Sequence, residues 1–546
     1  MTTAHLDTFV RDALPAPEEQ PEFLFTISEL QYPDKLNAAA ELIDTVDPAR
    51  IAVANDAGNW TYGEMSGLSD RIARLLVEKE GLVPGNRVLL RGPNTAMMFA
   101  AWLGVLKAGG IVVSTMPILR PGEIVPILQR GRISHAIVDE RFAEDFRTAA
   151  VKSEYTKSLV TYNGDAGGGG LERLVTETAP GFLPVATFSG DPALIGFTSG
   201  TTGDPKGCVH FHRDILAPAD TFARHILKPN ENDRWACTAP IAFTFGLGML
   251  LIFPWRFGGT AVTSEVPGAK ALVELIERFG VTILATAPTA YKSIAATVPE
   301  NAIQSLRSCI SAGEHLPEAT WHAWHDATGL KLINGIGATE MMHIFISAAG
   351  DDIKPGSTGK AVPGYKAVIL DEQNKPMTSG TGRLAVKGPV GCRYLADPRQ
   401  ANYVIKGWNV TGDTFRLDED GYFWYVSRSD DMIISSGYNI AAPEVENALL
   451  THEAVLECAV IGVPCPERGS KVKAFIVLKD TFQESAALQK DLQDYVKETI
   501  APYKYPRVME FVSNLPKTAT GKLQRFALRP SPFAKIKGNI NKSYDQ

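Results

Sequence analysis

The chain has 546 residues, of which 45% are hydrophobic, and its formal net charge is −7. At about 150 residues per domain this length predicts three or four structural units, and the negative charge argues against a general nucleic-acid partner. The six cysteines are scattered without a C-x-x-C pair, which indicates reduced thiols rather than a disulfide framework or a zinc site.

The N-terminal residues MTTAHLDTFVRDALPAPEEQ contain neither a basic start nor an apolar core of signal-peptide length. The most apolar stretch, residues 245–253, is soon broken by Pro254 and Arg256, whereas a membrane span needs about 20 apolar residues. We therefore expect a cytoplasmic protein that does not contact a membrane.

The first part of the chain alternates short apolar runs with helical patterns. Residues 269–279, for example, repeat apolar side chains at helical spacing between two apolar runs. Strands that alternate with helices favour an α/β fold with largely parallel sheets. The runs predicted as buried strands are residues 111–115, 193–197, 281–285 and 367–370, and the GDAGGGG segment at 164–170 is expected to be a flexible loop.

The composition changes after Tyr425, where charged and small residues separate the apolar segments. Residues 459–463 and 472–478 are predicted to be strands, and residues 485–499 a helix. A small α+β module is therefore expected to begin near Arg428.

The stretch FTSGTTGDPKGCVH concentrates hydroxyl groups and glycines in front of one lysine, just after an apolar run. Phosphates are bound by backbone N–H groups, hydroxyls and a cation, and glycines let the backbone approach them. The stretch therefore has the composition of a phosphate-binding loop, although an ordinary solvated turn stays open from composition alone. It does not match G-x-x-x-x-G-K-[ST], and neither does the later Gly-Lys pair at Gly521. The candidate phosphate ligands are Thr198, Ser199, Gly200, Thr201, Thr202, Gly203 and Lys206.

Five segments in order make this interpretation specific: FTSGTTGDPKG, NGIGATE, TGD, SRSDDMIISSGYNI and PKTATGKLQR. Together they resemble the motifs of adenylate-forming enzymes, the superfamily of acyl-CoA synthetases, nonribosomal adenylation domains and luciferases. The match runs from about Thr198 to Arg525, so it covers most of the chain.

The resemblance implies an α/β fold with a large N-terminal adenylation domain, residues 1–427, and a small mobile α+β C-terminal domain, residues 428–546. The large domain is expected to contain parallel and mixed sheets with helices, and a β-barrel-like subdomain. Asp430 matches the hinge between the domains, with a turn or helix cap as its alternative role. The implied reaction has two steps: a carboxylate attacks the α-phosphorus of ATP to give an acyl-adenylate and pyrophosphate, and the thiol of coenzyme A then displaces AMP.

The same resemblance gives individual residues their expected roles. Thr339 is expected to contact the α-phosphate. Glu340 is expected to bind Mg²⁺, which prefers carboxylate, phosphate and water oxygens, and a solvated glutamate at a helix start is its alternative. Lys522 is the leading catalytic residue, bridging the acid and the α-phosphate, although a lysine in such a loop is usually a surface residue. Gly437 is expected to line the tunnel that admits the thiol.

Two further sets are implied to hold the nucleoside. Asp413 is expected to accept bonds from both ribose hydroxyls, with Arg428 reaching the same sugar. A turn aspartate and a surface ion pair are the alternatives for these two residues. The residues expected around the adenine are Gly313, Glu314, Asn334 and Gly335.

The segment PIAFTFGLG resembles the one that carries the gate to the acyl pocket. Many family members have histidine at this gate, whereas here the spacing puts Phe243 there, as in benzoate-type ligases. ATEMMHIFIS and the N-terminal PEFLFTISELQYPDKLNAAAELID are also similar to benzoate and 2-aminobenzoate enzymes. His343 is then expected at the bottom of the pocket, with Gly335 and Gly337 shaping walls for a flat ring. A core histidine with satisfied hydrogen bonds is the alternative for His343.

Two other histidine pairs could ligate a metal. His210 and His212 form HFH, and His322 and His325 lie three residues apart in WHAWH. Each pair offers two ligands without a third, so we expect structural roles rather than zinc.

The leading expectation is an ATP- and Mg²⁺-dependent ligase that joins an aromatic carboxylic acid to coenzyme A. Two close alternatives are a medium-chain or branched aliphatic acid as the substrate and a carrier protein as the acyl acceptor. No feature indicates luciferase-type oxidation. A different class is a non-catalytic sensor of nucleotide or acyl-CoA, which the intact motif residues argue against. The expected partners are small molecules only, with the protein a monomer or a homodimer.

Overall fold

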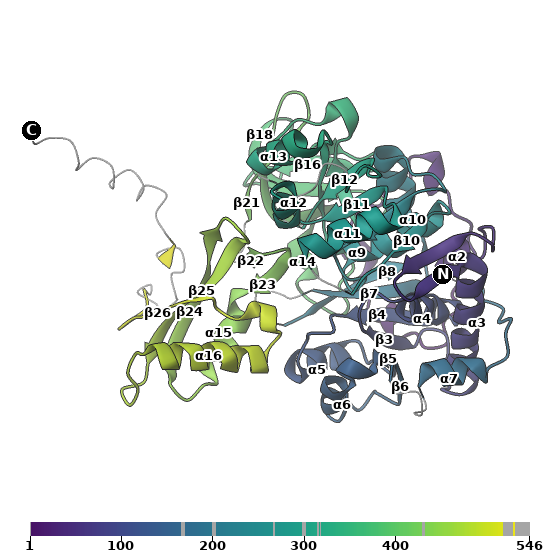
Figure 1. Cartoon of the computed structure of the whole chain (residues 1–546), viewed down its shortest axis with the longest axis horizontal. Coiled ribbons are helices and arrows are strands. Elements are labelled where there is room, and N and C mark those ends of the chain that lie inside the picture. Colours follow the sequence, from purple (N-terminus) through teal and green to yellow (C-terminus); the bar gives the residue numbers. More distant parts are fainter. Residues whose placement is uncertain are drawn as a thin grey trace, which may run out of the picture. The chain divides into compact units, whose positions relative to one another are not determined.

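The computed structural model describes residues 2–164, 170–198, 204–265, 268–297, 302–313, 316, 318–428, 432–516 and 528–529 (Figure 1). The chain forms two compact units, the first from residues 1–198 and 205–429 and the second from residues 199–204 and 430–546. Each unit has a hydrophobic core of its own.

The first sheet of the first unit is a parallel sheet closed by one antiparallel strand. Its order is β6-β5-β3-β4-β7-β8, and only the β7–β8 pair is antiparallel. Nearly every residue of β3, β4 and β5 is buried, because parallel strands are covered on both faces. The predicted strands at 111–115 and 193–197 are confirmed. The strands are β3 (Arg87–Arg91), β4 (Ile111–Thr115), β5 (His135–Asp139), β6 (Ser158–Tyr162), β7 (Pro192–Thr198) and β8 (Lys206–Phe211); the helices that accompany them are α2 (Ala38–Ile43), α3 (Tyr62–Glu78), α4 (Ala96–Lys107), α5 (Pro121–Arg130), α6 (Ala143–Ala150) and α7 (Leu171–Thr176).

The second sheet has the order β15-β14-β13-β12-β11-β9-β10-β1-β2 and is parallel from β1 to β13 through β10, β9, β11 and β12. The helix predicted at 269–279 is confirmed as α11 (Ala269–Phe279), which buries Leu272, Leu275 and Ile276 at helical spacing. The strand predicted at 281–285 is found slightly later, as β11. The remaining bounds are β1 (Ile51–Asn55), β2 (Gly58–Thr61), β9 (Arg234–Cys237), β10 (Thr260–Val262), β11 (Ile283–Thr286), β12 (Ser308–Ser311), β13 (Leu332–Gly337), β14 (Ile344–Ser347), β15 (Lys360–Ala361), α12 (Pro288–Ala295) and α13 (Glu318–Thr328).

Buried helical segments follow β8 and β9. Two of them, η4 (Ala219–Leu227) and η5 (Gly248–Ile252), are π-helices, which are rare and often occur at functional sites. They continue α8 (His212–Pro218) and α9 (Thr244–Leu247), and α10 (Phe253–Arg256) follows η5. The most apolar stretch of the sequence is therefore a buried helical segment, and none of the helices in the described ranges is long and apolar enough to cross a bilayer.

The third sheet is antiparallel, with the order β17-β16-β18-β20-β19 and β21 beside β20. The strand predicted at 367–370 is confirmed as β16, although only Ile369 and Leu370 are buried. The bounds are β16 (Lys366–Leu370), β17 (Pro376–Met377), β18 (Gly380–Lys387), α14 (Gln400–Tyr403), β19 (Val404–Ile405), β20 (Trp408–Leu417) and β21 (Phe423–Arg428). Thus the first unit combines parallel, mixed and antiparallel sheets with helices.

The second unit is an α+β module. Its strands β24 and β25 pair antiparallel, β26 adds parallel to β25, and β22 and β23 form a separate hairpin. The strands predicted at 459–463 and 472–478 lie within β24 and β25, and the helix predicted at 485–499 is α16, capped by the Ser485 side chain. The bounds are β22 (Met432–Ser435), β23 (Tyr438–Ala441), α15 (Ala442–Leu450), β24 (Val455–Cys465), β25 (Gly469–Leu478), α16 (Ala486–Thr499) and β26 (Val508–Phe511).

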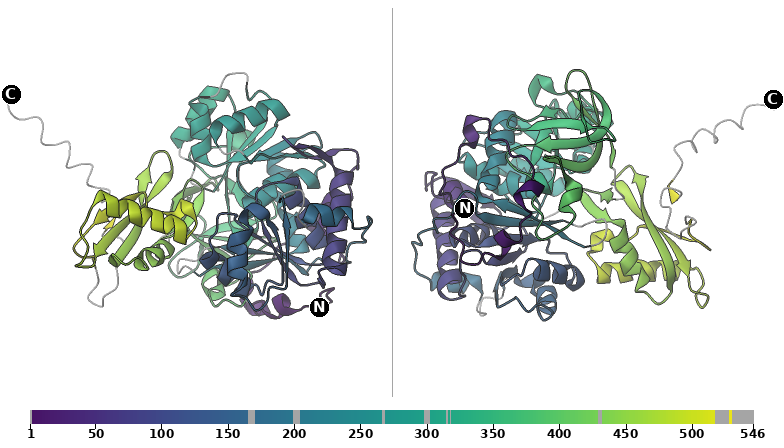
Figure 2. Two further views of the ribbon diagram at one scale, coloured as in Figure 1. Left: turned by 60° about the horizontal axis from the view of Figure 1, so that its bottom comes forward. Right: turned by 180° about the vertical axis from the view of Figure 1, so that it is seen from behind.

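The N-terminal segment before residue 25, purple in Figure 2, lies across the first unit. Backbone N–H groups of Leu6 and Asp7 donate to Pro84 O at 3.0 Å, just before β3. Further along, Ala396 N donates to Ala13 O at 2.9 Å. The segment thus joins the parallel sheet to the chain that follows β18.

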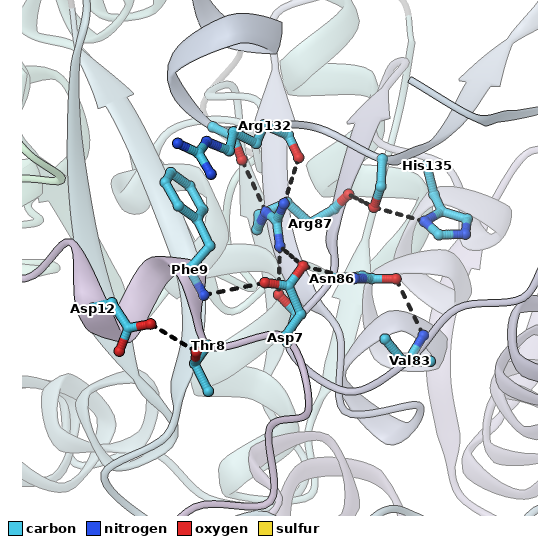
Figure 3. Close-up of polar contacts among 12 residues, drawn as sticks. Asp7, Thr8, Phe9, Asp12, Val83, Asn86, Arg87, Arg132 and His135 are labelled. Atoms are coloured by element: carbon cyan, nitrogen blue, oxygen red, sulfur yellow. Dashed lines mark hydrogen bonds and ion pairs between the residues drawn. The ribbon is translucent and has the colours of Figure 1, made fainter. Parts of the chain in front are cut away.

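Asp7 and Arg87 form the polar centre of this attachment (Figure 3). The Arg87 guanidinium pairs with Asp7 and also donates to carbonyl oxygens, including Gly131 O at 2.9 Å, while Asn86 Nδ2 donates to Asp7 Oδ2 at 2.9 Å. The ring of Phe9, in the short helix α1 (Phe9–Asp12), lies under the Arg87 guanidinium at 5.1 Å. Burial by itself would raise the pKa of Asp7, but the hydrogen bond and charge of Arg87 outweigh it and lower that pKa below its usual 3.8.

We expect Asp7→Asn to lower the melting temperature at pH 7, because it leaves the buried Arg87 without its counter-charge. The loss is about 1–3 kcal/mol, which corresponds to roughly 1–3 °C in a unit of this size. A carboxylate with a lowered pKa stabilises the fold above its unfolded-state pKa and ceases to do so as pH falls through the folded-state value, so the difference should shrink below about pH 4.

Asp12→Asn is the matched control, since Asp12 is exposed and its carboxylate accepts a bond of 2.7 Å from Thr8 Oγ1 of the same turn. Equal melting temperatures for the Asp7 variant and the unmodified protein at pH 7 would contradict the anchoring role.

Candidate active site

One edge of the first sheet carries polar side chains on one face. In β8, the alternate residues Lys206, Cys208 and His210 project to the same side. Residues 391–395 run beside β8, joined to it by two backbone hydrogen bonds of 2.8 Å and by a bridge between Cys208 and Tyr394. This segment brings Tyr394 next to Lys206.

Tyr394 connects two charged side chains. Lys206 Nζ donates to Tyr394 Oη at 2.9 Å, and the tyrosine hydroxyl donates to Oε1 of Glu340. Lys206 Nζ lies 3.8 Å from the same carboxylate oxygen. Glu340 is 7% exposed and Tyr394 only 1%, so water screens the carboxylate little, whereas the Lys206 side chain is 21% exposed.

The 3₁₀ turn η6 (Thr339–Met341) carries Thr339 and Glu340 and is held from two sides. His210 Nε2 lies 2.8 Å from Thr339 O, and because a carbonyl only accepts, this nitrogen donates. On the other side β7 comes so close that a Cβ added to Gly196 would lie 2.8 Å from Thr339 Cγ2. The turn therefore has little freedom to move.

Thr198 ends β7 opposite Lys206 in the strand register. Its Oγ1 is buried and lacks a hydrogen-bond partner among the described residues. A buried hydroxyl is normally paired, and a phosphate oxygen would satisfy this one. The other expected phosphate ligands, Ser199, Gly200, Thr201, Thr202 and Gly203, lie outside the described residues.

The expected adenine residues lie on neighbouring strands of the second sheet. Asn334 of β13 pairs with Ser311 of β12, and Gly313 follows β12 at φ +88°. Asn334 Nδ2 donates to Ser357 O at 3.0 Å, which fixes its amide, and Gly335 is the next residue of β13. Glu314 lies outside the described residues.

Asp413, the expected ribose ligand, is on the third sheet. It is 8% exposed and lies in β20, where it pairs in register with Arg428 of β21. The structure thus places the backbones of the two expected ribose residues opposite each other on adjacent strands. The Arg428 side chain is outside the described part of the chain.

His343 is enclosed by aromatic rings from the π-helix η4 and from α9 and α10, the short helices on either side of η5. Its ring centroid lies 5.6 Å from Phe222, 5.6 Å from Phe245 and 4.6 Å from Phe253. Burial lowers the pKa of His343 to about 3, against a smaller opposite effect of its bond to Phe245 O, so the ring is neutral. A Cβ on Gly248 would lie 2.4 Å from His343 Cδ2, which requires glycine there.

Close packing also explains the two glycines expected beside His343. A Cβ on Gly337 would lie 2.7 Å from His343 O, and one on Gly335 would lie 2.7 Å from Ile344 Cδ1. Both glycines let β13 approach the chain that carries His343.

Phe243 precedes α9 and is 39% exposed, an unusual degree for so large an apolar side chain. Its segment is fixed by Asn94, which accepts from Ile241 N at 2.9 Å and donates to Ala239 O at 3.1 Å. An accessible ring on an anchored backbone is suited to a gate.

The AMP-binding enzyme family matches residues 43–394, and the AMP-binding enzyme C-terminal domain matches residues 444–522. The chain belongs to the AMP-binding enzyme family.

Individual relatives narrow the activity of this AMP-binding enzyme. Benzoate–CoA ligase of Thauera aromatica is 37% identical over 514 residues, 92% of this chain and 97% of that one. Mitochondrial acyl-coenzyme A synthetase ACSM3 of Mus musculus is 32% identical over 529 residues, 92% and 91% of the two chains. The crystal structure of the anthranilate CoA ligase AuaEII in complex with anthranoyl-AMP is 33% identical, with a TM-score of 0.71 over 92% of this chain and 98% of that one. The protein is accordingly an acid–thiol ligase that uses ATP and coenzyme A and proceeds through an acyl-adenylate.

The other three histidines considered as metal ligands contact neighbouring protein groups. His212 is buried, accepts from Ala38 N at 3.1 Å, and burial lowers its pKa to about 3. In α13, His322 lies 3.6 Å from Glu318, and His325 lies 3.4 Å from Leu330 O. No cluster of three or more metal-binding side chains occurs within the described ranges.

In the second unit of the ligase, Gly437 lies in the turn between β22 and β23 with φ +80°. This conformation favours glycine by itself, so the turn gives a second reason for the residue besides a thiol tunnel. Lys522 and Asp430 lie outside the described residues, and their expected roles stay predictions.

Tyr394 was not identified from the sequence, and the partner of His210 was not foreseen. Tyr394 lies in VGCRYLADP, which has no periodicity or motif that marks a buried hydroxyl, and only the pairing of this segment with β8 reveals it. For His210 a structural role was expected without a named partner, and the structure identifies it as the donor to Thr339 O.

We expect Gly196→Ala to reduce adenylation about 10- to 100-fold, because the added methyl displaces Thr339, and small misplacements of reacting groups are costly. Pyrophosphate release measures this step. Gly190→Ala is the control, since a Cβ there meets nothing within 4 Å. Similar rates for the two variants would show that the contact between β7 and η6 does not matter for adenylation.

Proposed function

We propose that this ligase activates an aromatic carboxylic acid of the benzoate or 2-aminobenzoate type and transfers the acyl group to coenzyme A. The observation that carries this proposal is the neutral, buried His343 ring among Phe222, Phe245 and Phe253. Aromatic walls favour a flat ring through stacked and edge contacts. The benzoate and anthranilate ligases among the relatives support the same class of acid.

The hydrogen bonding of His343 favours an acid whose ring carries a donor. Nε2 faces Phe245 O at 3.4 Å and therefore carries the proton. Nδ1 is then a bare acceptor, and it is buried without a partner in the described structure. An amino group on the acid would pair with Nδ1, whereas unsubstituted benzoate would leave it unsatisfied.

The phosphates of ATP are proposed to lie at the end of β7. Thr198 Oγ1 and the loop that follows would hold the β- and γ-phosphates together with Lys206, and Thr339 would contact the α-phosphate. The Glu340 carboxylate is an oxygen ligand suited to Mg²⁺, which when bound offsets the charge of the phosphates. In this arrangement Lys206 and Glu340 orient the triphosphate for attack on its α-phosphorus.

The nucleoside is proposed to lie along β12, β13 and β20. Asp413 would accept both ribose hydroxyls, with Arg428 beside it. The adenine would be flanked by Gly313, Glu314, Asn334 and Gly335.

The C-terminal module completes the chemistry in this proposal. Lys522 would bridge the acid and the α-phosphate during adenylation, and a turn of residues 428–546 about Asp430 would then admit the thiol past Gly437. The six cysteines are all free thiols, which suits a reducing compartment such as the cytoplasm.

A medium-chain aliphatic acid is the second candidate substrate. The similarity to ACSM3 supports it, and the phenylalanine side chains around His343 could also contact an alkyl chain. The unpartnered Nδ1 argues against this candidate, since an alkyl chain offers it no donor.

We expect 2-aminobenzoate to be used with the highest kcat/KM, followed by benzoate, with octanoate at least about tenfold lower. Pyrophosphate release with each acid, with and without coenzyme A, measures this order. A preference for octanoate would replace the aromatic proposal, pyrophosphate without thioester would indicate a carrier-protein acceptor, and no pyrophosphate with any acid would indicate a sensor.

Within the same assay, His343→Leu should reduce kcat/KM for 2-aminobenzoate at least about tenfold and for benzoate much less, because only the amino group needs Nδ1. His322→Leu is the control, since His322 is half exposed on α13. Equal losses for both acids would remove the proposed hydrogen bond.

We expect Lys522→Ala to abolish adenylation while leaving thioester formation from supplied acyl-adenylate largely intact. Removing the cation raises the barrier only where the carboxylate meets the phosphate. Comparable losses in the two half-reactions, followed by pyrophosphate release and by thioester formation, would contradict this assignment.

A further inference from the structure

We propose that Tyr394 is a positioning residue whose hydroxyl keeps Lys206 and Glu340 close together but out of direct contact, so that both stay available to Mg²⁺ and the phosphates of ATP. The proposal rests on the placement of these phosphates beside Lys206 and Glu340. It does not depend on which acid the enzyme uses.

The geometry is that of a spacer. Lys206 Nζ lies 2.9 Å from Tyr394 Oη and 3.8 Å from Glu340 Oε1, whereas a charge-assisted hydrogen bond is about 2.7–2.9 Å long. One of the three N–H groups of Lys206 is used by the hydroxyl. Of the two carboxylate oxygens of Glu340, the hydroxyl binds Oε1 and leaves Oε2 without a bond from Tyr394.

The direction of the hydrogen bonds is fixed. The Tyr394 hydroxyl has one proton to donate, and it lies within hydrogen-bond distance of both Lys206 Nζ and Oε1 of Glu340. Since the lysine can only donate and the carboxylate only accept, the proton order is Lys206 to Tyr394 to Glu340. Tyr394 therefore gives each charged group one hydrogen-bond partner before the nucleotide arrives.

Loss of this hydroxyl would let the two charges meet. In a poorly hydrated site, opposite charges attract strongly at contact distance. A direct Lys206–Glu340 pair would occupy the lysine and one carboxylate oxygen, and ATP with its metal ion would have to break it first. The spacer thus lowers the cost of binding by preventing a competing ion pair.

Tyr394 is itself held rigidly, as a spacer requires. Its backbone N–H donates to Gln400 Oε1 at 2.9 Å, and Gln400 Nε2 donates to Glu19 O at 3.0 Å. The ring packs edge to face against Tyr403 at 5.8 Å, and the backbone is bridged to Cys208. These contacts do not involve the hydroxyl, so Phe can replace Tyr394 without disturbing them.

The test compares Tyr394→Phe with Tyr403→Phe in the full-length enzyme. Tyr403 is the neighbouring buried ring, and its hydroxyl lacks a hydrogen-bond partner among the described residues, so its removal is the matched control. Binding of a non-hydrolysable ATP analogue with Mg²⁺, and of AMP, is measured by calorimetry, together with the KM for ATP and the melting temperature without ligand.

We expect Tyr394→Phe to weaken binding of the Mg²⁺–analogue complex about tenfold and to raise the KM for ATP similarly, while AMP affinity and the melting temperature change little. Tyr403→Phe should change none of these. Equal weakening for AMP and the analogue, or a large fall in melting temperature, would make Tyr394 a general structural residue, and an unchanged analogue affinity would remove its role altogether.

A double-mutant cycle with Lys206→Met separates the spacer from other roles of the hydroxyl. If Tyr394 acts by keeping Lys206 from Glu340, adding Tyr394→Phe to Lys206→Met should cause no further loss. Additive losses would overturn the spacer. If Lys206→Met and Glu340→Gln both leave the affinity for the ATP analogue unchanged, the proposed position of the ATP phosphates beside these residues is wrong as well. These binding experiments do not test which acid the enzyme uses.

Discussion

A half-buried lysine and a buried glutamate of opposite charge lie 3.8 Å apart, too far for a direct hydrogen bond. Three separate parts of the chain create this condition: β8 supplies Lys206, the turn after β13 supplies Glu340, and the segment beside β8 supplies the hydroxyl between them. In the proposed site this spacing matters, because either charge alone would be costly to bury and a closed pair would have to be broken before ATP could bind. Much of the surrounding structure holds these three parts at fixed distances from one another.

The N-terminal segment helps to fix the position of Tyr394 through hydrogen bonds to the residues that follow it. Gln400, which binds the backbone of Tyr394, also donates to Glu19 O, and Ala396 N donates to Ala13 O. The Asp7–Arg87 cluster fixes the same segment to the start of β3. Residues at the beginning of the chain thereby support a site whose ligands come almost 200 residues or more later.

Local signals in the sequence predicted the parts of the fold that local physics determines. Apolar runs such as 111–115 became buried parallel strands, and α11 has the predicted bounds because its apolar spacing is regular. Helix α15 was missed, because charged and small residues hide its pattern. The motifs brought Thr198, Lys206, Thr339 and Glu340 to one place, but Tyr394 depends on pairing between segments about 190 residues apart, which no local pattern encodes.

The π-helices around His343 have a consequence for how this enzyme can change over evolutionary time. A π-helix holds an extra residue relative to an α-helix, and one residue corresponds to a rotation of about 100° around the axis. Deleting a single residue early in η4 would therefore turn Phe222 away from the imidazole while leaving every other side chain chemically the same. If His343 contacts the acid as proposed, acid preference would shift through the gain or loss of one codon, a route that comparison of substituted positions alone does not reveal.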